Sequence, residues 1–284
     1  MKGLQTWGCS LVIKIIPVPD GTFDYPEESL EEIEHSGWQD PNPPIQVVDH
    51  EGYLVVRDDL LGYGSKARFV DYMVRNMPQR EIVFGACPAT GYAQISLPAV
   101  ATRYNKRVHL FMAKRDLSRL TDFQKKGASL GSIYHWVPDG MLNVTKARAM
   151  EYAQEDPSDR VLLPIGLEHP TVIASIIKVA REQIDFLPQH VWSVGSSGTL
   201  NRGLQMAWPG AEVHVVSVGH NMSQREVGRA VMHRSAYKFD KAVKKEEMPP
   251  YPSAPTYDAK VWQPMVNWYK THSRPKEVLV WNVA

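Results

Sequence analysis

Residues 191–208 read VWSVGSSGTLNRGLQMAW, an apolar run that passes through a glycine- and serine-rich turn into a helical pattern. Glycines let the backbone turn sharply and come close to a ligand. The first amides of the following helix have no partner within the helix, and the helix dipole favours an anion there. The turn is therefore a candidate phosphate site, formed by Gly195, Ser196, Ser197, Gly198 and Thr199. The alternative is a tight strand-to-helix turn with a serine cap and no ligand.

The same alternation of short apolar runs and helical stretches extends over most of the chain. It predicts parallel βαβ units, and hence an α/β protein with helices on both faces of its sheets. We expect strands at Gly52–Arg57, Glu81–Ala86, Arg107–Ala113, Ser132–Val137, Val161–Ile165, His190–Val194, Glu212–Val218 and Glu277–Val283. We expect helices at Phe69–Asn76, Gln94–Tyr104, Leu120–Lys126, Met141–Gln154, Thr171–Ile184, Thr199–Trp208 and Ala259–His272. Residues 1–50, rich in proline and acid, predict an irregular wrapping segment with one strand at Leu11–Ile16.

The bulk properties exclude several classes of protein. The chain has 284 residues, 43% of them hydrophobic, and a formal net charge of +1, so it can bury a core and has no overall basic footprint for nucleic acid. Two local basic clusters, around Lys114 and around Lys244, are expected to be solvated. No window reaches the roughly 18 apolar residues of a membrane span. The two cysteines and ten histidines show no metal-ligand spacing, so we expect no catalytic metal and a cytoplasmic, reducing compartment.

A second loop precedes the candidate phosphate turn in the chain. Residues 55–68 read VVRDDLLGYGSKAR, and they place Lys66 after a glycine-rich loop at the start of a helix. A lysine in such a position is ordinarily a surface residue. Asp58 and Asp59 are expected to cap or brace this loop rather than to act as catalytic carboxylates.

This lysine segment resembles the cofactor-lysine segment of fold-type II pyridoxal-phosphate enzymes, nearest to the aminocyclopropane-carboxylate deaminase and D-cysteine desulfhydrase group. The GSSGT turn at 195–199 resembles the glycine-rich phosphate loop of that family. TGYAQ at 90–94, followed by ISLPAVATRYNKRVHLFM, resembles its substrate-carboxylate loop and helix. TYDAK at 256–260 resembles a late tyrosine-bearing loop, and VLVWNVA at 278–284 resembles the last strand. The resemblance covers roughly residues 45–284.

The resemblance implies a fold of two three-layer αβα domains with mostly parallel sheets, similar to the β subunit of tryptophan synthase. Residues 1–68 and 164–284 would form a large cofactor-binding domain, and residues 69–163 a small domain inserted in it. Pyridoxal 5'-phosphate would lie in the cleft between the two domains. A homodimer is also implied.

The resemblance further assigns roles to single residues. Lys66 would form the Schiff base with the cofactor and then move protons. The turn at 195–199 would anchor the phosphate, and Tyr257 would act as an acid or base. The substrate carboxylate would bind to Thr90, Gly91 and Ala93.

Two positions depart from the family pattern. Tyr92 stands where the family usually has asparagine hydrogen-bonded to the ring hydroxyl of the cofactor. As a catalytic and cofactor-binding residue, it would replace that bond, stack on the ring or reshape the substrate pocket. Asn282 and Val283 stand where many members have serine or threonine opposite the pyridine nitrogen. Asn282 could be a neutral partner of that nitrogen. Two further candidates come from position alone: Glu168 and His169 follow a predicted strand end and belong either to the pocket or to a surface loop.

Three functions remain open. The first is a deaminase or lyase that forms an external aldimine with a small amino acid and stabilises a carbanion at Cα. The second is a decarboxylase or related enzyme whose amino acid is attached to a nucleotide or modified DNA base, as in viral DNA modification. The third is a protein that binds pyridoxal phosphate, or a phosphate group alone, without catalysis.

Overall fold

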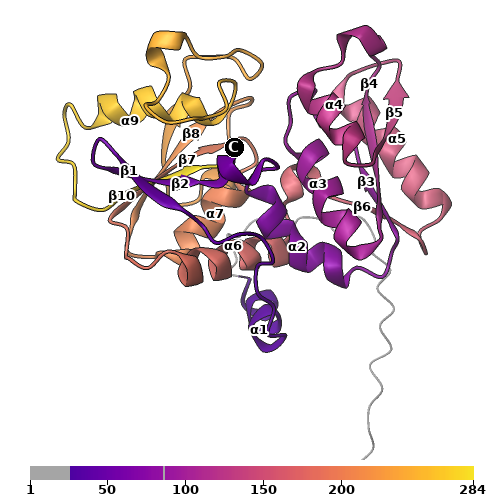
Figure 1. The fold of residues 1–284 in the computed structure, drawn as a ribbon, viewed down its shortest axis with the longest axis horizontal. Coiled ribbons are helices and arrows are strands. Elements are labelled where there is room, and N and C mark those ends of the chain that lie inside the picture. The colour runs from indigo at the N-terminus through magenta and orange to yellow at the C-terminus, as the bar shows by residue number, and fades with distance from the viewer. Residues whose placement is uncertain (1–25, 86) are drawn as a thin grey trace, which may run out of the picture.

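The strands of the structure, a computed structural model that describes residues 26–85 and 87–284, form two separate sheets (Figure 1). The larger sheet consists of β1 (Val47–His50), β2 (Tyr53–Arg57), β10 (Val278–Asn282), β7 (His190–Gly195), β8 (Glu212–Ser217) and β9 (Val231–Arg234), in that spatial order. The smaller sheet consists of β5 (Ser132–Val137), β4 (Arg107–Ala113), β3 (Glu81–Phe84) and β6 (Arg160–Leu162). The strand expected at Leu11–Ile16 lies outside the described residues.

Both sheets are parallel except at one edge, where β1 pairs with β2 in the antiparallel direction. The central strands are rich in apolar residues, and every residue of β10 is buried. Such strands are typical of parallel sheets with both faces covered. The predicted α/β fold with mostly parallel sheets is therefore confirmed.

Helices cover both faces of the larger sheet (Figure 1). On one face lie α6 (Pro170–Gln183) and α7 (Thr199–Ala207), which pack against each other. On the other face lies α9 (Trp262–Trp268), whose Trp262 and Met265 pack in one cluster with Trp192 of β7. The larger sheet thus has the predicted three layers.

The smaller sheet is covered in the same way. Its helices are α3 (Ala93–Ala101), α4 (Asp122–Ser129) and α5 (Leu142–Glu155). α3 and α4 contact each other, whereas α5 packs on a separate apolar cluster around Phe111. α2 (Lys66–Asn76) contacts both α6 of the larger unit and α3 of the smaller one. The strands of the smaller sheet all fall within residues 69–163, and the boundaries of that domain stay a prediction.

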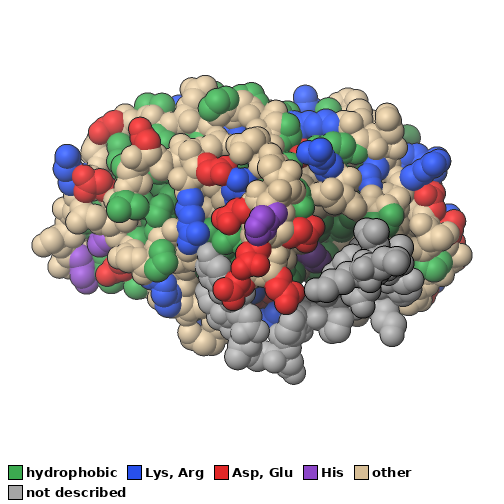
Figure 2. Space-filling model, turned by 90° about the horizontal axis from the view of Figure 1, so that it is seen from below, with side chains coloured by type: hydrophobic (Ala, Val, Ile, Leu, Met, Phe, Trp, Pro, Cys, Tyr) green, Lys and Arg blue, Asp and Glu red, His purple; other side chains and the backbone are tan. Residues whose placement is uncertain are grey.

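The prediction that residues 1–50 are irregular is wrong for α1 (Glu27–His35) and for β1. This helix buries only Leu30 and Ile33, which lie three residues apart on one face, and its glutamates are exposed. Figure 2 shows acidic side chains gathered on this side of the molecule. The short elements β9 and α8 (Gln224–Val227) were also not expected. Among the described residues, no helix is long and apolar enough to cross a membrane.

Candidate active site

A cavity lies at the carboxyl ends of β7 and β10. Its wall contains Lys66, Tyr257, Val283 and the whole turn Gly195–Thr199. Lys66 follows β2, and β2, β10 and β7 are neighbours in the sheet. Loops at the carboxyl ends of adjacent parallel strands meet at one edge of a sheet. That geometry brings the lysine to the glycine-serine turn although the two are far apart in sequence. Most of the remaining wall is apolar, from Phe69, Val70, Leu167, Val172, Ile176, Val194 and Leu200.

The turn at 195–199 packs so closely against its neighbours that glycine is required at one position within it and at one position that faces it. Gly198 has φ 74°, and a Cβ added there would lie 2.1 Å from the carbonyl oxygen of Glu226. Gly166 faces the turn with φ 69°, and its added Cβ would lie 2.2 Å from Cβ of Ser197. The Thr199 hydroxyl donates to the Gly166 carbonyl at 3.2 Å. The turn is thus held in one shape at the amino terminus of α7, where backbone amides lack helical partners.

The loop that carries Lys66 is braced by buried hydrogen bonds. Asp58 accepts hydrogen bonds from the Ser65 hydroxyl at 2.6 Å and from Nε of Arg68 at 2.9 Å. The Ser65 amide donates to the carbonyl of Val283 at 3.0 Å, which ties the loop to the end of β10. Nε1 of Trp281 donates to the Ser65 hydroxyl at 3.1 Å. The expected bracing role of Asp58 is confirmed.

The environment of Lys66 favours the neutral amine. Burial lowers the pKa of Lys66, and the nearby Asp258 and Cys87 oppose that shift only in part. A neutral lysine amine is the nucleophilic form. Burial in turn raises the pKa of Asp258 to about 7, while the backbone amide of Val283 donates to its Oδ1 at 3.1 Å.

Asp258 was not singled out in the sequence. It stands next to Tyr257 in the TYDAK segment, and this adjacency is the signal that could have drawn attention to it. The Tyr257 side chain is hydrogen-bonded to Ser196 of the turn, and burial raises the pKa of Tyr257. The cavity therefore holds a neutral phenol on one side and a lysine coupled to a carboxyl group on another.

The predicted carboxylate loop lies between β3 and α3 of the smaller unit and does not line the cavity. Its Gly91 amide donates to the Pro88 carbonyl at 2.8 Å, and Nε2 of Gln94 donates to the carbonyls of Ala89 and Gly91 at 3.0 and 2.9 Å. Thr90 is partly exposed, and Ala93 begins α3 with its side chain buried. The loop is thus ordered by its own hydrogen bonds.

Tyr92 lies between this loop and the lysine loop. A Cβ added to Gly64 would lie 3.1 Å from Cδ1 of Tyr92, and the ring meets Phe123 edge to face with centroids 5.0 Å apart. Burial raises the pKa of Tyr92 to about 12, so its phenol is protonated at neutral pH. Tyr92 therefore packs beside the lysine loop as a neutral ring.

Three other predicted residues lie outside the cavity wall and make structural contacts. Oε1 of Glu168 is 2.6 Å from NH2 of Arg202. His169 caps α6, and its Nδ1 accepts the Thr171 amide at 3.2 Å. Nδ2 of Asn282 donates to Asp59 and to the Pro252 carbonyl, both at 3.0 Å. These contacts give no support to a ligand role for the three side chains, and the residue next to Asn282, Val283, is the one that lines the cavity.

No protein-family model and no curated protein matches the sequence. Solved structures do match. An ACC deaminase homologue has a TM-score of 0.69 at 14% identity, over 86% of this chain and 89% of that one. The processed form of threonine deaminase isoform 2 from Solanum lycopersicum also has a TM-score of 0.69 at 14% identity, over 93% and 85%. Serine racemase from Dictyostelium discoideum has a TM-score of 0.60 at 10% identity, over 93% and 97%.

At these identities the likeness establishes the fold. The chain has the fold of fold-type II pyridoxal-phosphate enzymes, as the resemblance of its motifs predicted.

Proposed function

We propose that this chain is a pyridoxal-phosphate enzyme of the deaminase or lyase type, which acts on the carbon bearing the amino group of an amino acid. One observation carries the proposal. Lys66, a lysine whose pKa is lowered by burial, shares a cavity with a glycine-serine turn at a helix amino terminus. An amine nucleophile and an anion cradle are the two attachments that this cofactor needs.

The residues of the cavity fit the cofactor. The turn at 195–199 offers backbone amides and the hydroxyls of Ser196 and Ser197 to a phosphate group, while the Thr199 hydroxyl holds the turn to Gly166. Lys66 would hold the aldehyde carbon. When bound, the cofactor supplies an electron sink for the reacting carbon, and the protein supplies orientation and electrostatics.

Side chains of the protein would then transfer protons and set the charge of the site. Lys66, whose pKa is lowered by burial, would accept the proton from Cα and return it. Tyr257 keeps its proton because burial raises its pKa, so it would act as a hydrogen-bond donor from the side of Ser196. Asp258 would set the charge of the site through its coupling to Lys66. The loop of Thr90, Gly91 and Ala93 would hold the substrate carboxylate.

The first experiment tests the covalent attachment. Purified protein reconstituted with pyridoxal phosphate should turn yellow, and borohydride should fix the cofactor on the peptide that contains Lys66, as read by mass spectrometry. Lys260 is an internal control, since it is also buried with a lowered pKa but donates to the carbonyls of Lys238 and Phe239. A protein that stays colourless, or that is labelled equally on Lys260, would overturn the proposal. Colour and labelling without turnover of any amino acid would indicate the non-catalytic alternative.

A second candidate substrate class has its own support. Lys114 and Arg115 are exposed directly after β4, the neighbour of β3, at the same edge of the smaller sheet as the carboxylate loop. The hydroxyl of Thr121 donates to the Ala89 carbonyl at 2.6 Å and ties this basic segment to that loop. A pair of cations on the same side of the smaller sheet as the carboxylate loop favours a substrate with an anionic extension, such as an amino acid attached to a nucleotide.

Assays on both classes separate them. Free D-cysteine, aminocyclopropane carboxylate and threonine would be compared with amino acids attached to nucleotides, following released ammonia and carbon dioxide. If the nucleotide-linked class is correct, a Lys114→Ala, Arg115→Ala double variant should raise KM with little change in kcat. Efficient turnover of a free amino acid, unchanged in that double variant, would leave only the first class.

A further inference from the structure

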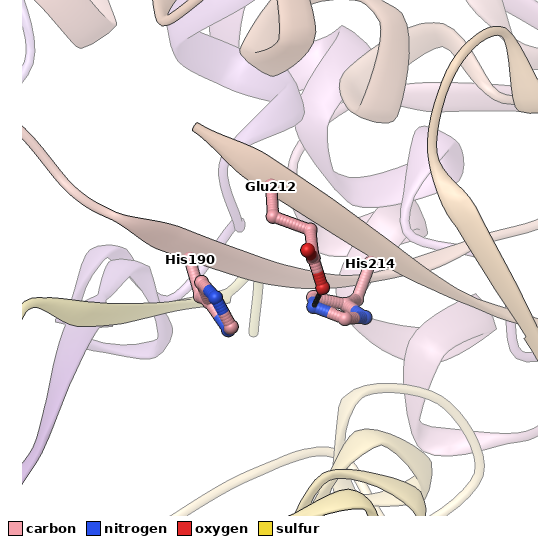
Figure 3. Close-up of side chains that lie close together, drawn as sticks. All are labelled: His190, Glu212 and His214. Atoms are coloured by element: carbon pink, nitrogen blue, oxygen red, sulfur yellow. Dashed lines mark ion pairs between the residues drawn. The ribbon is translucent and has the colours of Figure 1, made fainter. Parts of the chain in front are cut away.

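The amino-terminal edge of the larger sheet carries three side chains of the metal-binding type. His190 begins β7, and Glu212 and His214 lie on the neighbouring strand β8 (Figure 3). One ligand atom of each residue lies within 4.8 Å of the others. The register explains the grouping: His190 is paired with Glu212, and His214 follows two residues later, so all three project from one face of the sheet.

Neighbouring side chains fix the orientation of both imidazole rings. Nδ1 of His190 lies 2.8 Å from the hydroxyl of Tyr269, which also accepts a hydrogen bond from Nε1 of Trp192 at 3.0 Å. Nδ1 of His214 lies 3.1 Å from Nε2 of His233. Both contacts occupy Nδ1 and leave Nε2 for another partner. Hydrogen bonds of this kind orient histidine ligands in metal sites.

The remaining nitrogen of His214 has an unusual environment. Nε2 is buried and makes no hydrogen bond within the described part of the chain, although Oε1 of Glu212 lies only 3.0 Å away. The two atoms are close but not aligned for a hydrogen bond. Ligands at about 2.0–2.1 Å from a tetrahedral zinc ion are about 3.3 Å apart, so a shared ion would satisfy both atoms with little movement.

The donor atoms of the cluster suit a cation. Zn²⁺ binds histidine through an imidazole nitrogen and glutamate through a carboxylate oxygen, and the cluster offers both kinds of donor atom. Glu212 is 48% exposed, which gives an ion a path from solvent and leaves room for a water ligand.

We propose that His190, Glu212 and His214 bind one divalent transition-metal ion of the zinc class. Two imidazole nitrogens and one carboxylate oxygen suit Zn²⁺, whereas Mg²⁺ and Ca²⁺ prefer oxygen ligands throughout. The ion joins β7 to β8 at the end of β7 that is opposite the cavity. Its function is to stabilise this edge of the sheet, and its place is independent of the proposed cofactor.

The test is zinc binding to the full chain. Protein treated with a chelator and dialysed should take up one equivalent of Zn²⁺ in a calorimetric titration, and the ion should raise the melting temperature. His190→Ala and Glu212→Gln should each weaken binding tenfold or more and abolish the thermal shift. Both residues are at least partly exposed, so the variants should fold. The buried His214 is left intact because it stacks on Trp192.

A matched control is His220→Ala. His220 lies 3.0 Å from Glu226 in an exposed pair outside the cluster, so its loss should leave zinc affinity unchanged. The proposal is wrong if the wild-type chain binds no stoichiometric zinc, or if His190→Ala and Glu212→Gln bind as tightly as wild type. It is equally wrong if the control variant loses as much affinity as they do.

Discussion

The two ends of strand β7 place polar groups in different surroundings. At the carboxyl end, Gly195 opens the turn that lines an apolar cavity together with Lys66. At the amino end, His190 belongs to a cluster of imidazoles with a half-exposed carboxylate. The two ends are five residues apart, or about 16 Å at roughly 3.3 Å per residue. One strand therefore separates a largely apolar cavity from an open cluster of polar side chains.

The surroundings of each end of β7 indicate which kind of chemistry that end can support. Burial shifts the pKa of both Lys66 and Asp258 toward their neutral forms. Reactions that move protons benefit from such matched, desolvated groups. At the other end Glu212 stays open to solvent, so an ion can enter and be held by charge. The first end suits proton transfer, and the second suits binding.

The largest expected effect that tests this contrast is the pH dependence contributed by Asp258. Its folded pKa of about 7 lies above its ordinary value of 3.8, so the stability it contributes is complete below about pH 4 and is lost as the pH rises through about 7. At about 1.36 kcal/mol per pKa unit this amounts to about 4 kcal/mol at most. Asp258→Asn should remove this loss. Urea unfolding of the cofactor-free protein across the pH range measures it.

The control for the Asp258 prediction is Glu212→Gln, which exchanges a carboxylate for an amide at the open end of the sheet. The difference in free energy of unfolding between Asp258→Asn and wild type should grow with pH. A difference that is the same at about pH 4 and about pH 8 would show that burial does not raise the pKa of Asp258.

Sequence patterns predicted the parallel core well and its edges poorly. The predicted strands Arg107–Ala113 and Ser132–Val137 have the same bounds in the structure, because tertiary pairing follows their apolar runs. α1 was missed because it buries only Leu30 and Ile33 and begins after Pro26 without a side-chain cap. A pattern of two apolar residues among glutamates is too weak to distinguish from an irregular acidic segment.

The residues of the candidate sites likewise fall into those that local sequence predicts and those that depend on tertiary structure. Lys66 and the turn at 195–199 were found because glycine-rich loops between strand and helix have a local sequence pattern. The importance of Asp258 depends on its burial, which arises only when the end of β10 packs over it. The cluster of His190 and Glu212 depends on strand register, a pairing over more than twenty residues that no local spacing reveals. Burial and register are tertiary properties.

A smaller effect is expected from Gly198→Ala in the turn at the carboxyl end of β7. The residue has φ 74° and an added Cβ would lie 2.1 Å from the Glu226 carbonyl oxygen, so the turn must distort. Strain of this kind costs about 1–3 kcal/mol. The variant should be less stable by that amount and should bind pyridoxal phosphate more weakly, as read by absorbance titration, while its zinc affinity stays unchanged.

The matched control for Gly198→Ala is Gly210→Ala, since a Cβ at Gly210 would meet nothing within 4 Å. Equal stability and equal cofactor affinity in Gly198→Ala and Gly210→Ala would mean that the turn does not need its left-handed residue. A simultaneous fall in zinc affinity would mean that the two ends of β7 are not independent.

The smallest effect concerns Tyr269, the positioning residue at the open end. Its hydroxyl orients His190 through Nδ1, so Tyr269→Phe should leave the ligand atoms in place but free the ring to rotate. Loss of such an orienting bond typically weakens a metal site about tenfold or somewhat more. Zinc titration should show this fall, with no change in cofactor absorbance. Tyr237→Phe removes a comparable hydroxyl, bonded to Glu247 at 2.6 Å, and should have no effect on zinc. If the two variants bind zinc equally well, Tyr269 does not orient the ligand, and the ring of His190 is held by packing alone.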